Sequence, residues 1–330
     1  MKLRNIFAVG LAALAGLSQA QEPAKQQGLV AIVQVNEKSK PGKLVVKSAS
    51  GKDTFVYYDR GTEQDVQRNA SKMKLFFLQT PEDMVEAEHA LAAGDLDQAA
   101  TKLAAVKDKY KGYLGLDRNP AERAALLELD CAARRKDFES LKRLAGTFPH
   151  ADWLSDQDKR KVMSARVLAK ACTGGAAAEV EADVKALLED KGAAMINGNC
   201  YGWLQYALAH VTAAAIPAEE IAGTISEGNL ATANKAIDLY CQAGASSHGR
   251  EMELPVDAMT RAQALLWAMP GVKEYAAKGG AMDAGKWGAA PANFRDAVAL
   301  AYMLKNIFGA GNEAIDAAAK LYFNTQAGKE

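Results

Sequence analysis

The stretch AEHALAAGDLDQAATKLAAVKDKY, residues 87–110, carries the main information about the fold of this chain. It consists of two alanine-rich segments separated by the short turn Ala93-Gly94-Asp95. Alanine is the strongest helix former, and glycine often follows the last residue of a helix because it adopts positive φ without strain. The stretch therefore predicts two helices joined by a tight turn, an α-hairpin.

Helix start signals extend this pattern towards the C-terminus. Proline is favoured in the first turn of a helix, where its missing N–H group has no partner to lose. Five prolines are placed in this way, in Thr80-Pro81, Asn119-Pro120, Ile216-Pro217, Leu254-Pro255 and Ala290-Pro291. We expect a helix to begin at each of them.

Apolar side chains recur at helical spacing in the segments between these signals. One such stripe consists of Cys200, Trp203, Leu204, Ala207, Leu208 and Val211, and another of Met163, Val167, Leu168, Ala171 and Cys172. A stripe of this kind is the core-facing side of an amphipathic helix. About one residue in five is alanine, which favours a mainly helical protein as well.

Residues 87–106 resemble the tetratricopeptide repeat (TPR), a paired-helix unit of about 34 residues. Gly94-Asp95-Leu96-Asp97-Gln98-Ala99, followed by Leu103, is similar to the family's turn into its second helix, with Leu96 in an aromatic position. Residues 135–141 form a looser second copy, and Phe148-Pro149 resembles the family's closing proline. The motifs cover residues 81–150, and only helical periodicity continues beyond them. The resemblance implies a right-handed α-solenoid of degenerate TPR-like hairpins over residues 80–330.

Residues 1–20 have the pattern of a secretory signal peptide. Lys2 and Arg4 precede an uncharged, largely apolar run over residues 6–17, and Ser18-Gln19-Ala20 places small residues before a cleavage site. Twelve apolar residues would span about 18 Å as a helix, which is too short for a bilayer core of about 30 Å. We expect cleavage near Ala20-Gln21, a linker over residues 21–28, and a periplasmic or secreted product without a membrane span.

A small antiparallel β module is predicted over residues 29–79. Residues 29–35, 43–47 and 54–58 are rich in β-branched and aromatic side chains, which favour strands. Residues 73–78 form a possible further strand, and the sheet is expected to pack on this segment or on the first helix. Phe55, Tyr57 and Tyr58 are interpreted as packing residues, with a ligand-binding face as the alternative.

The four cysteines form two pairs with the same separation of 41 residues, Cys131 with Cys172 and Cys200 with Cys241. This separation is close to the repeat spacing, and an exported protein permits disulfides. We therefore hypothesise bridges Cys131–Cys172 and Cys200–Cys241. Buried thiols are the alternative, because each cysteine lies on an apolar stripe.

The sequence contains no recognisable catalytic or cofactor-binding motif. We therefore predict no catalytic residues, no metal ligands and no cofactor. The four histidines show no H-E-x-x-H pattern. Gly285-Lys286-Trp287 has tryptophan where a phosphate-binding loop needs a hydroxyl residue, and residues 279–288 are interpreted as a loop. A net charge of zero argues against a nucleic-acid binder, which needs clustered positive charge.

These features, with a resemblance to exported bacterial TPR-type proteins of unassigned function, favour a protein- or peptide-binding scaffold in the cell envelope. Aromatic residues dominate binding hot spots, so Tyr110, Tyr113 and Trp153 are candidate partner contacts, with core packing as the alternative. Two other functions stay open. One is a structural spacer docked through its β module, and the other is an envelope enzyme whose ionisable residues converge only in space.

Overall fold

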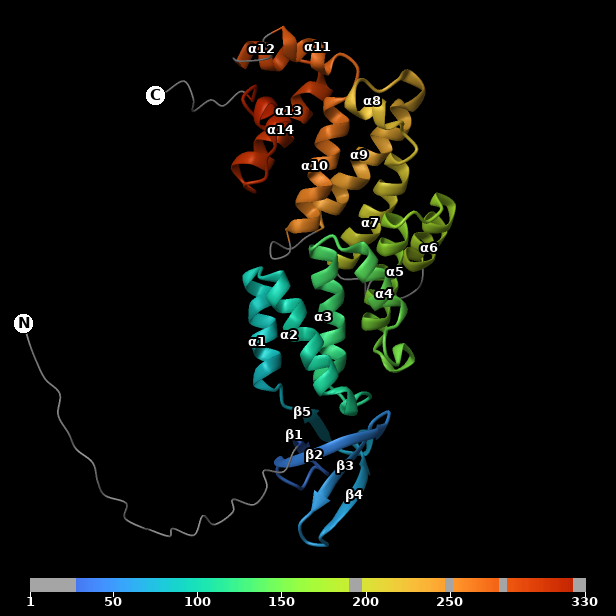
Figure 1. The fold of residues 1–330 in the computed structure, drawn as a ribbon, viewed down its shortest axis with the longest axis vertical. Helices are drawn as coiled ribbons and strands as arrows, with labels where there is room; N and C mark the ends of the chain where they lie inside the picture. Colours follow the sequence, from blue (N-terminus) through green and yellow to red (C-terminus); the bar gives the residue numbers. More distant parts are fainter. Residues whose placement is uncertain (1–27, 190–197, 247–251, 279–283, 323–330) are drawn as a thin grey trace, which may run out of the picture.

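The computed structural model describes residues 28–189, 198–246, 252–278 and 284–322. The protein is mainly helical, with a small antiparallel sheet at the N-terminal end of the described chain (Figure 1). This confirms the predicted mainly α class with an N-terminal β module. The signal peptide and most of the linker lie outside the described residues. In the part of the chain that is described, no helix has both the length and the apolar character needed to cross a membrane.

The sheet has five strands in the order β4-β3-β2-β1-β5, and every neighbouring pair is antiparallel. The strands are β1 (Leu29–Gln34), β2 (Gly42–Gly51), β3 (Thr54–Asp59), β4 (Gln64–Asn69) and β5 (Leu75–Leu78). The three predicted strands and the possible strand at residues 73–78 are therefore present. Strand β4 was not predicted, because its sequence QDVQRN is polar and mostly solvent-exposed at the edge of the sheet.

One face of the sheet is buried against the first helices. Phe55 and Phe76 are buried and their rings stack with centroids 4.7 Å apart, and Tyr57 is buried beside them. They belong to the same apolar cluster as Met84, on the first helix, so sheet and helices share one core. Phe55 and Tyr57 are packing residues, as the sequence indicates.

Fourteen α-helices follow the sheet in the described residues. In chain order they are α1 (Glu82–Ala93), α2 (Leu96–Lys109), α3 (Pro120–Arg134), α4 (Phe138–Gly146), α5 (Asp156–Cys172), α6 (Ala177–Glu189), α7 (Gly198–Ala213), α8 (Ala218–Ala222), α9 (Leu230–Ala245), α10 (Glu253–Trp267), α11 (Val272–Ala277), α12 (Ala284–Ala289), α13 (Ala292–Asn306) and α14 (Glu313–Ala319). Each of the five prolines expected at a helix start lies at the residue before a helix or in its first turn. Helix α12 corrects the expectation of a loop for residues 284–288, since Lys286 and Trp287 between its two glycines, and an alanine at each end, sustain a short helix; residues 279–283 lie outside the described chain.

The two sequence copies that resemble a TPR have the same turn geometry. Gly94 and Lys136 both have left-handed φ, of 80° and 57°. The next residues, Asp95 and Asp137, each cap the following helix by accepting a hydrogen bond from the backbone N–H three residues later, at 3.1 Å in both copies. Each aspartate N–H also donates to a carbonyl five residues earlier, at 3.0 Å. The resemblance in sequence is therefore matched by a repeated local structure.

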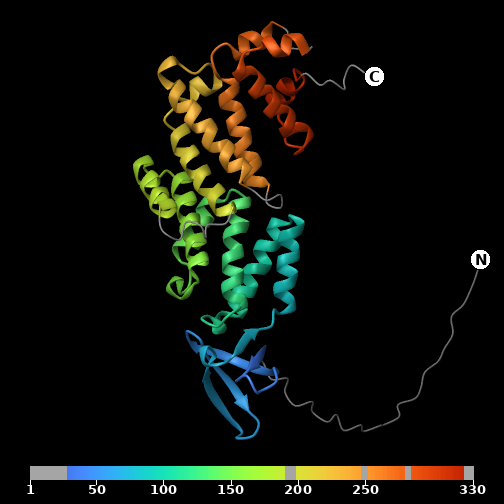
Figure 2. The same cartoon turned by 180° about the vertical axis from the view of Figure 1, so that it is seen from behind.

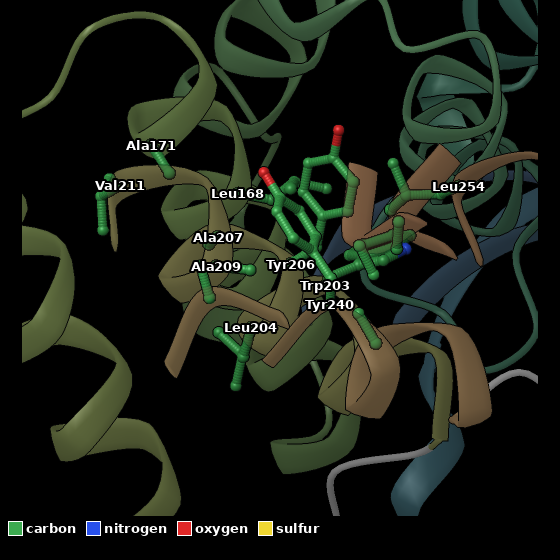
Figure 3. Close-up of a cluster of buried hydrophobic side chains, with 14 of the residues drawn as sticks. Leu168, Ala171, Trp203, Leu204, Tyr206, Ala207, Ala209, Val211, Tyr240 and Leu254 are labelled. Atoms are coloured by element: carbon green, nitrogen blue, oxygen red, sulfur yellow. The ribbon is translucent and has the colours of Figure 1, made fainter. Parts of the chain in front are cut away.

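Successive helices pack side by side, and the molecule is elongated. Figures 1 and 2 show the sheet at one end and α11–α14 at the other. A large apolar cluster runs through the helices from α3 to α13, and Figure 3 shows Tyr206 and Tyr240 within it, near Trp203 and Leu254. Two helices far apart in the chain also meet, because the C-terminal end of α3 contacts the start of α10.

Candidate partner-binding grooves

Two of the three predicted partner contacts are core residues at the junction of sheet and helices. Tyr110 is 8% exposed, and its hydroxyl lies 3.0 Å from a carboxylate oxygen of Asp83 on α1. Tyr113 is 9% exposed and donates to the backbone carbonyl of Val46 on β2, at 3.2 Å. Both side chains thus join elements of the same chain, which is the packing alternative that the sequence left open.

Trp153 is half-buried and lies close to the same contact between the sheet and the helices. Its ring stacks on His150, with centroids 4.0 Å apart and an interplanar angle of 8°. Its six-membered ring also packs so close to Gly115 that a side chain at Gly115 would clash with it. Gly115 in turn accepts a hydrogen bond from the backbone N–H of Asp53, at 2.8 Å. Trp153 therefore covers a contact between the sheet and the helices, with one part of its surface left exposed.

The hypothesised disulfides are absent from the described chain, which includes all four cysteines. Cys131 and Cys172 are free thiols. They face different cores, since Cys131 packs in the sheet cluster and donates to the carbonyl of Leu96 at 3.0 Å, whereas Cys172 packs on the larger helical cluster. Cys241 is an exposed free thiol on α9, whereas Cys200 on α7 is 2% exposed, so these two side chains lie on differently exposed faces of neighbouring helices. Neither of the two equally spaced pairs forms a disulfide in the described chain.

A network of charged side chains joins the C-terminal end of α3 to α10, and we call it the α3–α10 junction. The guanidinium of Arg134 donates to both carboxylate oxygens of Glu253, at 2.8 and 2.9 Å, and to the carbonyl of Leu91 at 2.9 Å. Lys136 donates to Asp257 at 2.9 Å. These pairs connect residues that are 119 and 121 positions apart in the chain.

Asp257 is the centre of this junction. Besides Lys136 it accepts hydrogen bonds from the Tyr206 hydroxyl, at 2.6 Å, and from Arg261, at 2.7 Å. Burial alone would raise the pKa of the Asp257 carboxyl, but these three donors outweigh burial and hold the pKa below its usual value. The carboxylate is therefore charged and fully engaged with side chains of its own chain.

Other ionisable groups surround this carboxylate. The ring of His210 is nearly parallel to that of Tyr206, with centroids 6.3 Å apart, and burial lowers the pKa of its imidazole. Burial raises the pKa of the Cys172 thiol and that of the Tyr240 hydroxyl, each to about 12. Thiol and phenol are thus held in their neutral forms. An enzyme hypothesis requires ionisable side chains that converge in space, and the α3–α10 junction is such a cluster. Its central carboxylate, Asp257, already accepts hydrogen bonds from three side chains of the same chain.

A large hollow lies between α5 and α6, with a volume of about 470 Å³. Its apolar lining consists of Met163, Val167, Ala186 and Leu187. Met163 is 46% exposed, which corrects its assignment to a core-facing stripe. The physical reason is its position at the margin of that stripe, where α6 leaves α5 uncovered. Small-molecule sites typically measure about 300–1,000 Å³, so the hollow is large enough to hold a ligand or a few side chains of a partner.

A second hollow of about 330 Å³ lies between α4 and the C-terminal end of α5. It is lined by Lys142, Arg166, Lys170 and the turn Thr173-Gly174-Gly175, with Gly146. Arg166 lines both hollows, and its Nε donates to the carbonyl of Ala145 on α4 at 2.9 Å. We call the two hollows together the α4–α6 groove. Figure 1 shows α4, α5 and α6 at one side of the molecule.

The charges of the α4–α6 groove are unbalanced. Its lining contains five cationic side chains, Lys142, Lys159, Arg160, Arg166 and Lys170, and two carboxylates, Asp156 and Asp183. Both carboxylates have lysine partners, since Lys170 lies 3.0 Å from Asp183 and Lys159 lies 3.9 Å from Asp156. Within the described ranges, Lys142 and Arg166 form no ion pair. The uncompensated positive charge of the groove therefore comes from Lys142 and Arg166, on a chain whose net charge is zero.

A third hollow, of about 330 Å³, lies between α2, α3 and α4, in the region that resembles the TPR. Leu114, Leu144 and Phe148 contribute apolar lining. Its charged lining is largely paired, Lys107 with Glu128 and Lys111 with Asp108. This hollow adjoins the predicted contacts Tyr110 and Tyr113, but neither tyrosine is among its lining residues.

Across the described segments, no cluster of histidine, cysteine or carboxylate side chains has the arrangement of a metal site. Comparison with models of known protein families, with curated proteins and with solved structures finds no match to this chain. Function is therefore inferred from the grooves and from the charges around them.

Proposed function

We propose that the protein is an exported, TPR-like helical-repeat scaffold that binds a protein or peptide partner in the cell envelope. Export is supported by the signal pattern of residues 1–20, and the repeat assignment by the matching turns at Gly94-Asp95 and Lys136-Asp137. In such an array, stacked hairpins form an extended surface on which a partner segment lies.

The observation that carries the proposal is the α4–α6 groove. It combines an apolar floor with charged side chains along its edges, as peptide-binding grooves between helices do. Met163 lines the first hollow of this groove with nearly half of its surface exposed, and exposed methionines are common at surfaces that accept varied peptide side chains. We therefore assign partner binding to the α4–α6 groove rather than to Tyr110, Tyr113 and Trp153.

Site-specific photo-crosslinking tests this proposal. Met163 is replaced by the photoreactive amino acid benzoylphenylalanine in the full chain, which is then expressed and irradiated in its native host. Met303 on α13 is the matched control, because it is also a helical methionine and is 40% exposed, close to the 46% of Met163. We expect a discrete adduct from position 163 and none of the same mass from position 303.

The partner identified from the adduct by mass spectrometry is then purified and must bind the purified protein directly. Equal adducts from both positions would show nonspecific contact. Absence of an adduct from position 163, in a variant that retains its helical circular dichroism, would overturn the assignment of the groove.

A further inference from the structure

We infer that the partner of the α4–α6 groove is an acidic amphipathic peptide segment, whose carboxylates meet Lys142 and Arg166 and whose aliphatic side chains rest on Met163, Val167 and Leu187. The inference rests on the proposed function and specifies its partner. It follows from two separate properties of the groove, the surplus of positive charge and the position of the apolar floor.

The cations of the groove differ in the partners that the chain gives them. Lys170 is held by Glu179 at 2.7 Å and by Asp183 at 3.0 Å, so its charge is neutralised within the chain. Lys142 is exposed on α4 and pairs with no carboxylate in the described segments. Arg166 makes a hydrogen bond to an uncharged carbonyl, which leaves its charge uncompensated. Two unpaired cations at one hollow favour an anionic occupant, because charge complementarity steers binding and excludes cationic partners.

The guanidinium of Arg166 is suited to a carboxylate in particular. Its Nε is fixed against α4 by the bond to Ala145, which orients the planar group between the two hollows. A guanidinium binds a carboxylate through parallel N–H donors, and fixing it in advance reduces the entropy lost on binding. The same group forms part of the lining of the apolar hollow, so an acidic residue bound there places its neighbours over that hollow.

The apolar floor distinguishes a peptide from a polyanion. Met163 and Val167 are one helical turn apart on α5, and Leu187 on α6 lines the same hollow. Val167 and Leu187 are largely buried, so Met163 and Ala186 supply the exposed part of this floor. A nucleic acid or an anionic polysaccharide presents charge at every repeating unit and would leave this floor uncovered. A peptide with aliphatic residues on one face and carboxylates beside them satisfies both parts of the groove, as an amphipathic helix does in a hydrophobic groove.

Fluorescence anisotropy with synthetic peptides tests the inference on the purified chain from residue 21 to residue 330. The probe is a labelled amphipathic peptide with leucine on one face and glutamate at the remaining positions. Two matched peptides replace every glutamate by glutamine or every leucine by serine. We expect the leucine–glutamate peptide to bind at least tenfold more tightly than either, and to weaken as salt increases, since salt screens exposed charges.

Charge reversal in the protein provides the second arm. Lys142→Glu is expected to weaken binding of the leucine–glutamate peptide about tenfold or more, because it replaces an attraction by a repulsion. Lys278→Glu, at an exposed position after α11, makes the same chemical change far along the chain and is expected to leave binding unchanged. Circular dichroism confirms that both variants are folded.

Each other outcome overturns the inference in a distinct way. Equal binding of the glutamine peptide would show that charge is irrelevant, and equal binding of the serine peptide would show a site that recognises charge alone, open to any polyanion. Lack of binding by all three peptides, with an adduct still formed at position 163, would refute the acidic partner and leave the proposed function standing. Lack of both peptide binding and adduct would refute the acidic partner and the proposed function together.

A second copy of the chain is the remaining possible occupant of the groove. It would be identified if the protein formed a dimer that the Lys142→Glu substitution dissociates.

Discussion

The α3–α10 junction and the α4–α6 groove are built from the same kinds of charged side chain, but they differ in where those charges find partners. In the junction, Arg134 and Lys136 meet Glu253 and Asp257 from a distant part of the chain. In the groove, Lys142 has no carboxylate partner among the residues that the structure describes. The two regions thus differ in whether the chain itself supplies the counter-charge, and in our proposal this decides whether a cation stabilises the fold or binds a partner.

The largest expected effect comes from removing the central carboxylate of the junction. Asp257→Ala leaves the buried Tyr206 hydroxyl and the charge of Arg261 without their acceptor. Hydrogen bonds to charged groups contribute about 1.5–3 kcal/mol, so we expect the free energy of unfolding to fall by about 2–3 kcal/mol. Urea denaturation measures the change.

The matched control for this variant is Asp238→Ala, at an exposed position on α9. Its stability is expected to remain within about 0.5 kcal/mol of the parent chain. Similar losses in the two variants would mean that the junction contributes no more than an ordinary surface carboxylate.

A smaller effect is expected from the protonation of His210 beside the junction. Burial is the main cause that lowers the pKa of its imidazole, and the charge of Arg261 acts in the same direction, whereas Asp257 opposes them. The unfolded chain, with a histidine pKa of about 6.5, therefore binds a proton more readily than the folded chain. The contribution of neutral His210 to the free energy of unfolding is therefore fully present above about pH 6.5. It is lost as the pH falls from there through the folded-state pKa.

Replacement of His210 by glutamine removes this titration. We expect His210→Gln to flatten the pH dependence of the unfolding free energy between about pH 7 and about pH 5, the range in which histidine titrates. His89→Gln, on the exposed face of α1, is the corresponding control. If the unfolding free energy of His210→Gln kept the same slope against pH, the imidazole would not contribute to that dependence.

The carboxylates Asp257 and Glu253 titrate in a different range. Their pKa values are lowered, so their contribution to stability is lost only at a more acidic pH.

The smallest effect gives the most direct test of the comparison, because it contrasts two lysines six positions apart. Lys136→Ala removes an ion pair with a largely buried carboxylate, and we expect a loss of about 1 kcal/mol. Lys142→Ala is expected to change stability by less than about 0.5 kcal/mol. Differential scanning calorimetry measures both. Equal destabilisation by the two substitutions would remove the distinction between junction and groove.

The sequence predicted the local structure of the chain better than it predicted the distant contacts. The turn at Gly94-Asp95, the helix starts at the prolines and the three strands depend on interactions within a few residues, which residue type and spacing reveal. Strand β4 was missed, because an edge strand with two exposed faces has no alternating apolar pattern.

The candidate site could not be predicted for a related reason. In the sequence, Lys136 and Lys142 are indistinguishable surface cations, and only the approach of α10 gives one of them a partner. Met163 looked like a core residue, because periodicity indicates one face of a helix and not how much of that face the next helix covers. Tyr110 and Tyr113 were candidate partner contacts with core packing as the alternative, and their burial against α1 and the sheet agrees with that alternative. An excess of positive charge over residues 134–170 was the signal available in the sequence.

The contact between α3 and α10 also restricts how this protein can change in length. In an open stack each hairpin meets only its neighbours, so a repeat can be inserted or deleted at any point. Here, one additional helix between α4 and α9 would displace Glu253 by about 10 Å, one interhelical spacing, and separate it from Arg134. We therefore expect an inserted or deleted repeat within this interval to break the Arg134–Glu253 pair, and one outside the interval to leave the pair in place.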